Sequence, residues 1–189
     1  MQTVLPSGFK RGQVLMLEGA PHVIEQFHTT GTAKTKRGLH AKLRSLITGR
    51  HVARVFTEGE RVPVTELGSR TVQFSYREGD TFVFLDAQTF EELDLTVEQV
   101  GERHWFLKEN EEYKALFLAG KLLEVVLPDS VALKVEETAP AQRGGADGAW
   151  KSAKLEGGLE IMVPLFIGPA DAIRVDTVER KYLRKETAE

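Results

Sequence analysis

The side chains with the clearest chemical potential are the cations of HTTGTAKTKRGLHAKLR, residues 28–44. This stretch has no Asp or Glu, and its cations are Lys34, Lys36, Arg37, Lys42 and Arg44. No carboxylate lies between Glu25 and Glu58, whereas Arg50 and Arg54 also fall in that interval. Clustered cations bind a polyanion such as RNA by releasing its condensed counterions, and a carboxylate would be repelled there. The pattern indicates a surface that meets a polyanion; the alternative is a solvated basic face without a ligand.

The sequence gives little indication of a catalytic site. The histidines, at 22, 28, 40, 51 and 104, lack a metal-binding spacing such as H-E-x-x-H. GTAKTKRG is not a phosphate-binding loop, because Lys-Ser or Lys-Thr does not follow Gly38, and no G-x-S-x-G motif is present. Acid pairs at 91–92, 111–112 and 136–137 could flank a substrate, but such pairs are usually solvated. We therefore expect no enzymatic activity, catalytic residue, metal site or cofactor; an undetected active site is the weakest hypothesis.

The basic residues must be positioned by strands. KLRSLITGRHVARVF, residues 42–56, alternates Leu43, Ser45 and Ile47 with Lys42, Arg44 and Leu46, and turns at Thr48-Gly49. A period of two predicts a half-buried antiparallel ribbon with a basic outer face. Other strand-length runs separated by turn residues lie at 13–27, 71–86, 115–128, 131–135, 159–163 and 173–176.

Helix is scarce in the predicted structure. TVEQVG at 96–101 has Thr96 as a predicted N-cap, Gln99 in the capping-box position and Gly101 as a stop. Many short strands with little helix predict small β-barrels or sandwiches. We expect Phe74, Phe82 and Phe84 in a barrel core, because an acidic segment would repel the phosphates of stacked RNA.

Charge is distributed unevenly over the 189 residues, which have a net charge of −3. The balance is +6 over residues 1–65, −7 over 66–128 and −2 over 129–189. Boundaries are predicted near residues 61–66, where Pro63 interrupts, and near Pro128, and residues 141–149 read as an exposed Gly-rich loop. The absence of cysteine and of a long apolar run favours a soluble cytoplasmic protein without a membrane partner.

Three segments, in order, resemble bacterial translation elongation factor P: KLRSLITGRHVARVF, FSYREGDTFVFLDAQTFEEL and KSAKLEGGLEIMVPLFIGPADAIRVDT. The resemblance covers essentially the whole chain, and the length also agrees with the family. Its most specific part is K-x-A-x(4)-G-x-x-x-x-V-P-x-F, formed by Lys151, Ala153, Gly158, Val163, Pro164 and Phe166.

The resemblance implies an all-β protein of three small barrels in an L-shaped arrangement that mimics tRNA. Residues 1–65 would form an SH3-like, KOW-type domain with the basic tip hairpin, and residues 66–128 and 129–189 two OB-fold domains. The resemblance also implies a monomer that binds the ribosome between the P and E sites. There it would contact large-subunit rRNA near the peptidyl-transferase centre, the small subunit and peptidyl-tRNA, and would relieve stalling at consecutive prolines.

The family's tip commonly reads PGKG with a modified lysine. Counting back from KLRSLITG places the tip on Lys34, between Ala33 and Thr35, so the loop departs from the pattern. A covalent extension of Lys34 by a modifying enzyme is expected from the resemblance, and a shifted tip would present Lys36 or Arg37. The atypical loop leaves open a divergent paralogous subgroup.

Contacts with RNA or tRNA are predicted for Lys34, Lys36, Arg37, His40, Lys42, Arg44, Tyr182 and Arg184. A long cation at a hairpin tip can hold a tRNA 3′ end in a reactive pose, and orientation alone lowers a barrier by several kcal/mol, on the order of 7–11 at most. Tyr182 could instead pack in a terminal strand, and Arg50 and Arg54 could be merely solvated. The alternative function is an RNA chaperone or regulator built of SH3-like and OB barrels that acts away from the ribosome, which the acidic middle segment disfavours.

Overall fold

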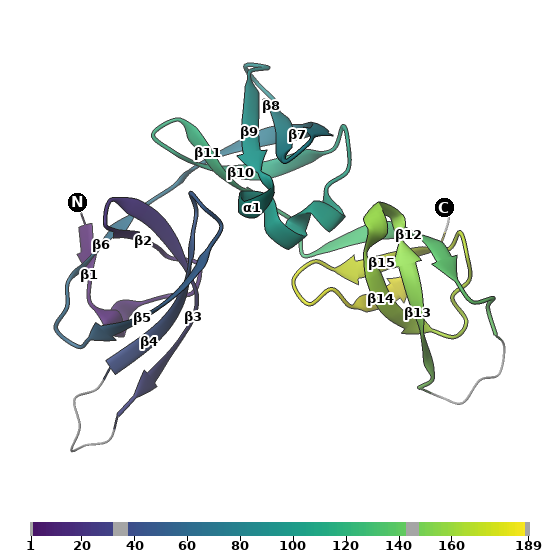
Figure 1. Cartoon of the computed structure of the whole chain (residues 1–189), viewed down its shortest axis with the longest axis horizontal. Helices are drawn as coiled ribbons and strands as arrows, with labels where there is room; N and C mark the ends of the chain where they lie inside the picture. The colour runs from purple at the N-terminus through teal and green to yellow at the C-terminus, as the bar shows by residue number, and fades with distance from the viewer. Residues whose placement is uncertain (1, 32–37, 143–147, 188–189) are drawn as a thin grey trace. The chain divides into compact units, whose positions relative to one another are not determined.

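The computed structural model describes residues 2–31, 38–142 and 148–187 (Figure 1). These residues form three antiparallel sheets, so the predicted all-β class is confirmed. The chain divides into two compact units, Met1–Gly101 with Glu109–Val126, and Glu102–Lys108 with Leu127–Glu189. Helices in these described ranges are only a few residues long, and none has the length and apolar character of a membrane span.

The first sheet belongs to the first unit and pairs its six strands in the order β1-β6-β2-β3-β4-β5. The strands are β1 (Gln2–Val4), β2 (Val14–Leu17), β3 (Ala20–Thr30), β4 (Gly38–Ser45), β5 (His51–Thr57) and β6 (Val62–Thr65). A 3-10 turn, η1 (Pro6–Gly8), follows β1. Inward side chains close a core in which Leu15, Ile24, Leu43 and Phe56 are fully buried. From Gln26 to Thr30, β3 pairs with β4 but not with β2, so the β3–β4 ribbon extends beyond β2 (Figure 1).

The second sheet completes the first unit, with its strands in the order β11-β10-β7-β8-β9. The strands are β7 (Gly68–Glu78), β8 (Thr81–Asp86), β9 (Glu92–Thr96), β10 (Glu112–Leu118) and β11 (Lys121–Val126). Helix α1 (Val97–Val100) follows β9 and has the predicted capping box: Thr96 Oγ1 accepts from the Gln99 amide, and Gln99 Oε1 accepts from the Thr96 amide. Phe74, Phe82 and Phe84 are buried, as predicted.

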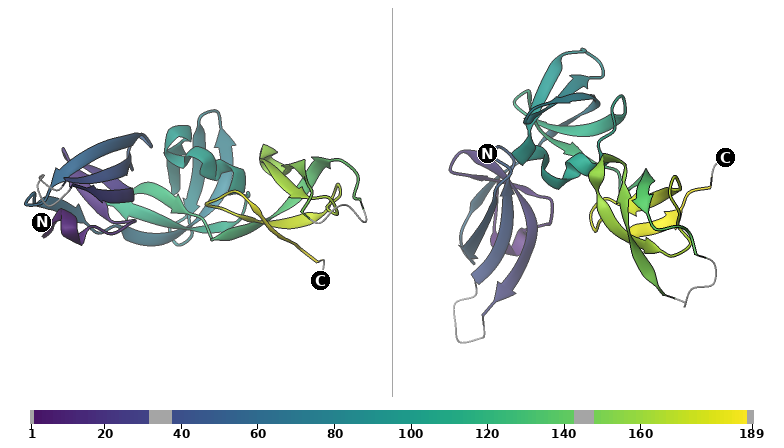
Figure 2. Two further views of the ribbon diagram at one scale, coloured as in Figure 1. Left: turned by 90° about the horizontal axis from the view of Figure 1, so that it is seen from below. Right: turned by 45° about the vertical axis from the view of Figure 1, so that its right-hand side comes forward.

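The third sheet forms the second unit, with its strands in the order β14-β13-β12-β15-β16. The strands are β12 (Ser130–Thr138), β13 (Trp150–Leu155), β14 (Glu160–Pro164), β15 (Ala172–Asp176) and β16 (Tyr182–Lys185), with 3-10 turns η2 (Gly101–Phe106) and η3 (Glu156–Gly158). In both five-stranded sheets the first strand in chain order is central and lies between the second and the fourth. This shared order is that of a five-stranded Greek-key OB barrel. Figure 2 shows each sheet curling on itself.

The most specific sequence motif proves to be mainly structural. Lys151 Nζ donates to the carbonyl oxygens of Ala139 and Pro140 and so holds the end of β12. Ala153 and Val163 are buried in the core of the third sheet. Gly158 has φ +90°, and a Cβ there would lie 3.2 Å from the Trp105 ring. The motif therefore requires a small residue and a left-handed backbone where the indole covers the barrel.

A small apolar cluster joins the first two sheets within the first unit. Val14, Leu46 and Leu123 are buried together, and Val23, Leu67 and Leu118 pack against them. The prediction that Leu46 lies on the outer face with Arg44 is wrong, because β4 ends at Ser45 and Leu46 turns into this cluster. Gln99 Nε2 donates to the Leu46 carbonyl at 3.3 Å, which ties α1 to the turn after β4. We call the apolar cluster, the hydrogen bond between Gln99 and Leu46, and the neighbouring Gly49 together the joint.

Gly49 is the tightest point of the joint. Its φ is +71°, and a Cβ there would lie 1.9 Å from the Glu98 carbonyl oxygen. We expect Gly49→Ala to destabilise the first unit by more than about 3 kcal/mol, through clash and strain combined. The matched control is Gly19→Ala, with φ +80° and no atom within 4 Å, which should cost only about 1–2 kcal/mol. Urea unfolding followed by far-UV circular dichroism measures both, and equal losses would contradict a tight joint.

An aspartate organises the turn between β8 and β9. Asp86 is buried, and its Oδ1 accepts from the amides of Gln88 and Thr89 at 2.9 and 3.1 Å, while Arg70 approaches Oδ2 at 3.5 Å. These two backbone hydrogen bonds, and then Arg70, hold the pKa of the Asp86 carboxyl below its ordinary value of 3.8, against the effect of burial. Asp176 makes the same pair of bonds to Val178 and Glu179 between β15 and β16.

The sign of the Asp86 pKa shift sets its contribution to stability at each pH. A carboxyl with a lowered folded pKa stabilises the fold above its unfolded pKa, and this contribution is lost as the pH falls below about 3.8. We expect Asp86→Asn to lower the urea midpoint at pH 6 and to approach the wild-type midpoint at pH 3. Asp94→Asn, an exposed change on β9, serves as control. A deficit for Asp86→Asn that is the same at both pH values would refute the assigned cause.

Candidate nucleic-acid interface

The β3–β4 ribbon carries the cations predicted to contact RNA. Along β4 the side chains of Leu39, Ala41 and Leu43 are buried, and the intervening ones point out of the barrel. Lys42 and Arg44 therefore lie on the outer face, as the alternation predicted, and His40 lies there with them. Lys34, Lys36 and Arg37 lie outside the described residues, in the sequence that connects β3 to β4.

The outer face has two features towards the end of the ribbon. His40 is directly opposite His28 on β3, and their imidazoles stack with centroids 5.2 Å apart and an interplanar angle of 11°. The Lys42 side chain is about half exposed, and its Nζ lies 3.8 Å from Glu25, a weak solvent-screened pair. Lys42 thus keeps its ammonium available to solvent and to a phosphate.

Arg44, by contrast, is held by two carboxylates in the first unit. Its Nε donates to Glu25 at 3.0 Å, and its Nη2 donates to both oxygens of Glu124 on β11 at 3.0 and 3.2 Å. The side chains of Arg44 and Glu124 are only 12% and 13% exposed. This geometry supports a tie between the first two sheets; RNA contact by Arg44 stays a prediction.

The other two cations of the acid-free interval differ from each other. Arg50 is exposed in the turn before β5. Arg54 donates to Glu60 at 2.8 Å, and its guanidinium lies 4.8 Å from the centroid of Phe56. Arg54 is therefore engaged within its own barrel, which differs from the alternative of a merely solvated side chain without a partner.

In the second unit, Tyr182 and Arg184 lie on β16. Tyr182 packs against the core, and its ring meets Trp150 edge to face at 6.1 Å. Burial raises the pKa of the Tyr182 hydroxyl. Arg184 is 68% exposed, with Nε 3.5 Å from Glu186. Trp150, about half exposed, is an aromatic residue of this surface that the sequence reasoning missed, because it directly follows the Gly-rich loop.

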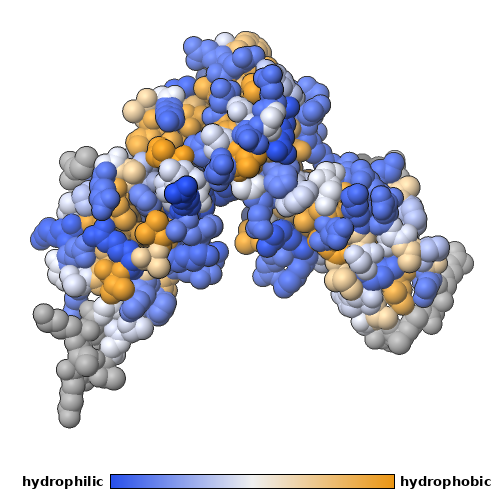
Figure 3. All heavy atoms as spheres, in the orientation of Figure 1, coloured by the Kyte–Doolittle hydropathy of each residue, from blue (hydrophilic) through white to orange (hydrophobic). Residues whose placement is uncertain are grey.

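The outer surface of the second sheet is acidic. The charge of Glu92, then burial, Glu78 and Asp94 raise the pKa of the Tyr76 hydroxyl. A negative surface repels phosphate, so the β3–β4 ribbon is better suited to an RNA contact than this sheet is. Apolar side chains gather only in small patches on the face shown in Figure 3, among mostly hydrophilic residues.

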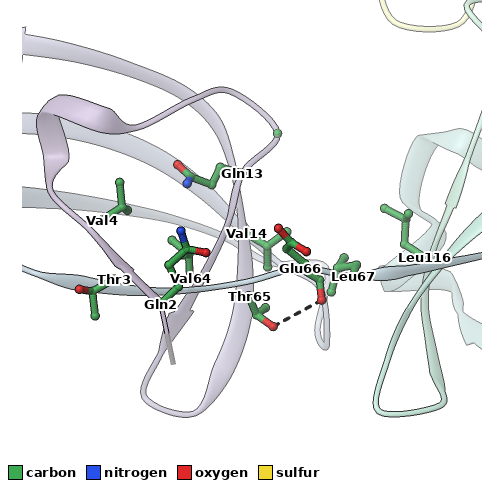
Figure 4. Close-up of a pocket in the computed structure, with 11 residues that line it drawn as sticks. Gln2, Thr3, Val4, Gln13, Val14, Val64, Thr65, Glu66, Leu67 and Leu116 are labelled. Carbon is green, nitrogen blue, oxygen red and sulfur yellow. Dashed lines mark hydrogen bonds between the residues drawn. The ribbon is translucent and has the colours of Figure 1, made fainter.

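A hollow of the first unit has few side chains that could support catalysis. It has a volume of about 590 Å³ and lies beside Thr65–Leu67, with Gln2, Gln13, Val64 and Leu116 on its walls (Figure 4). Thr65 Oγ1 donates to the Glu66 carbonyl at 3.5 Å. Glu66 carries the one carboxylate in the lining of this hollow. Among the described residues, no three His, Asp or Glu side chains converge as metal ligands would.

The fold and the ribbon define a class of protein: linked small β-barrels, one of which presents a cationic, carboxylate-poor arm of the kind that meets nucleic acid. Family models agree along the chain. "Elongation factor P (EF-P) KOW-like domain" matches residues 7–62, "Elongation factor P (EF-P) OB domain" matches 67–125, and "Elongation factor P, C-terminal" matches 131–185.

Curated relatives give the same answer. Elongation factor P of Microcystis aeruginosa is 38% identical over 94% of this chain and 97% of its own. Elongation factor P of Prochlorococcus marinus is 39% identical over 95% and 96%. The chain therefore belongs to the elongation factor P family of translation elongation factors. A solved structure, eukaryotic translation initiation factor 5A from Methanococcus jannaschii, matches 66% of this chain and 94% of its own at 20% identity with a TM-score of 0.49, a likeness too slight to carry an argument.

Arg44 gives a test of the tie between the first two sheets. Arg44→Ala withdraws the guanidinium from the carboxylate of Glu124 and leaves Glu25 with only its more exposed partners, so we expect the first unit to lose up to about 3–5 kcal/mol. Arg54→Ala breaks the more exposed pair with Glu60 and should cost at most about 1 kcal/mol, apart from its contact with Phe56. Arg44→Met with Glu124→Leu should recover part of the loss, because it removes both members of the second pair.

Urea unfolding followed by far-UV circular dichroism measures the free energy of unfolding of these variants. Both tryptophans, Trp105 and Trp150, belong to the second unit, so tryptophan fluorescence supplies an internal reference within the same samples. Equal losses for Arg44→Ala and Arg54→Ala would show that the Arg44 contacts are not a structural tie.

Proposed function

We propose that this protein binds the ribosome between the P and E sites and stimulates peptide-bond formation where consecutive prolines stall it. Its basic arm enters the peptidyl-transferase region, and the segment between β3 and β4 touches the acceptor end of peptidyl-tRNA. Large-subunit rRNA lines the arm, and the second unit meets small-subunit RNA through Tyr182 and Arg184. The protein acts as a monomer in the cytoplasm.

The observation that carries the proposal is the outer face of the β3–β4 ribbon. It presents Lys42 and the His28–His40 pair, and the sequence between Glu25 and Glu58 contains no carboxylate that would oppose RNA. Each cation that contacts a phosphate releases counterions and so favours association. Membership of the elongation factor P family supports the ribosome as the RNA partner.

Positioning is the mechanism that such an arm can supply. The protein contributes no acid, base or nucleophile; Lys34 restrains the tRNA 3′ end so that less orientational freedom is lost on reaching the transition state. The ties of Arg44 to Glu25 and Glu124 support this role, because an arm that must orient a substrate needs a rigid base. A modifying enzyme extends Lys34 covalently, which lengthens its reach; Lys36 or Arg37 takes this place if the tip is shifted.

The test is a reconstituted translation assay that compares a tri-proline message with a tri-phenylalanine message. We expect the wild-type protein to accelerate the proline message, and Lys34→Ala to lose about tenfold of that acceleration, which equals about 1.4 kcal/mol of barrier. Lys114→Ala, an exposed cation on β10, is the control and should retain the acceleration. Parallel Lys36→Ala and Arg37→Ala variants test the position of the tip.

Two results would contradict the proposal. If the wild-type protein leaves both messages unchanged but binds free RNA tightly, the off-ribosome RNA module is the better description. If Lys34→Ala, Lys36→Ala and Arg37→Ala all keep full acceleration, the arm does not act through a cationic tip.

A further inference from the structure

A second hollow lies at the base of the arm, beside β3. Its volume is about 420 Å³, within the roughly 300–1,000 Å³ range of small-ligand sites. Its lining consists of Arg11, from the loop before β2, and the consecutive residues Glu25, Gln26, Phe27 and His28 of β3. Neither Arg11 nor His28 is among the residues predicted from the sequence to contact RNA.

The lengths of the strands create this hollow. β3 has eleven residues, but β2 pairs only with Ala20–Val23, and the loop before β2 bonds only to Ile24. From Gln26 to Thr30, β3 pairs with β4 alone, so in the described structure its other edge is uncovered. Arg11 borders this open edge, so the hollow lies where β3 has a neighbouring strand on one side only.

Flat side chains gather at the hollow. Phe27 lines it with a ring that is 39% exposed. His28 is exposed, and its ring already stacks on His40, beside which Val55 is paired on β5. Across the outer face, neighbouring strands thus present Val55, His40 and His28 side by side. His28 is the last of the three, on the open edge, where a further planar group can stack on its ring.

The hollow has one cation that can bind a ligand and one carboxylate that is already compensated. Within the described ranges, Arg11 has neither an ion pair nor a side-chain hydrogen bond, so its guanidinium is free to bind an anion. Glu25 is the one acid of the lining, and its carboxylate is already engaged by Arg44 at 3.0 Å, His51 at 3.2 Å and Lys42 at 3.8 Å. The carboxylate therefore opposes a phosphate weakly.

We propose that this hollow binds one unpaired nucleotide of an RNA strand. The base stacks on His28, Arg11 binds the phosphate, and the exposed amide of Gln26, on the same face of β3 as His28, reaches the base edge. Stacking on aromatic and imidazole rings combined with a nearby guanidinium is how proteins bind single-stranded RNA. The inference rests on the proposed function, since it adds a site to the same arm, but it concerns different residues from the tip.

The probe is a fluorescein-labelled hexa-adenylate RNA, whose binding to the full chain is followed by anisotropy over a range of salt concentrations. We expect Arg11→Ala and His28→Ala each to weaken binding by about five- to tenfold. Arg11→Ala should also reduce the slope of log affinity against log salt by about 0.7, because one phosphate contact is lost, whereas His28→Ala should leave the slope unchanged.

Matched controls separate the hollow from general charge and aromatic effects. Lys10→Ala removes the adjacent cation of the same loop, which does not line the hollow, and Phe90→Ala removes the 74% exposed aromatic residue that precedes β9. Both should bind like wild type. Arg11 and His28 are exposed, so we expect their variants to fold like the wild type. A thermal melt followed by circular dichroism checks this.

The outcomes distinguish this site from the proposed function. Equal effects of Lys10→Ala and Arg11→Ala, equal affinity for a duplex of the same sequence, or competition by free AMP as effective as by the strand would overturn the site. Normal acceleration of the proline message by the wild-type protein would then leave the proposed function standing. Conversely, loss of hexa-adenylate binding in both variants supports the site even if the translation assay fails.

Discussion

The contact between Arg44 and the carboxylates of Glu25 and Glu124 is the interaction on which the first unit depends. A guanidinium with only 12% of its side chain exposed needs partners on more than one side, and two strands of different sheets supply them. Leu46, Gln99 and Gly49 close the same joint with apolar packing, a hydrogen bond and a left-handed turn. The base of the arm is thereby fixed to the acidic sheet.

The same contact compensates the negative charge of Glu25. Glu25 stands at the start of a cationic ribbon, where a free carboxylate would weaken attraction for RNA. Arg44, His51 and Lys42 surround it, so its charge is largely compensated. The excess of acids in residues 66–128 thus belongs mostly to the second sheet, whereas the acid-free interval belongs to the first sheet of the same compact unit.

Residues that make the family recognisable are not those that would bind RNA. Lys151, Ala153, Gly158 and Val163 hold a strand end, fill a core and allow an indole to cover the third barrel. Their spacing reflects packing, which tolerates few alternatives. The exposed residues of the arm, such as Arg11 and His28, face solvent and can differ between relatives without loss of the fold.

The sequence by itself determined the barrel elements, the capping box at Thr96, the burial of Phe74, Phe82 and Phe84, and the outer position of Lys42, because strand periodicity and capping are local. Only the tertiary structure decided what Arg44, Leu46 and Arg11 do. Arg44 and Leu46 meet residues about 80 positions away on β11, and Arg11 borders β3 only because β2 is short. Such contacts arise when separate strands pack, and no periodicity along a single strand encodes them.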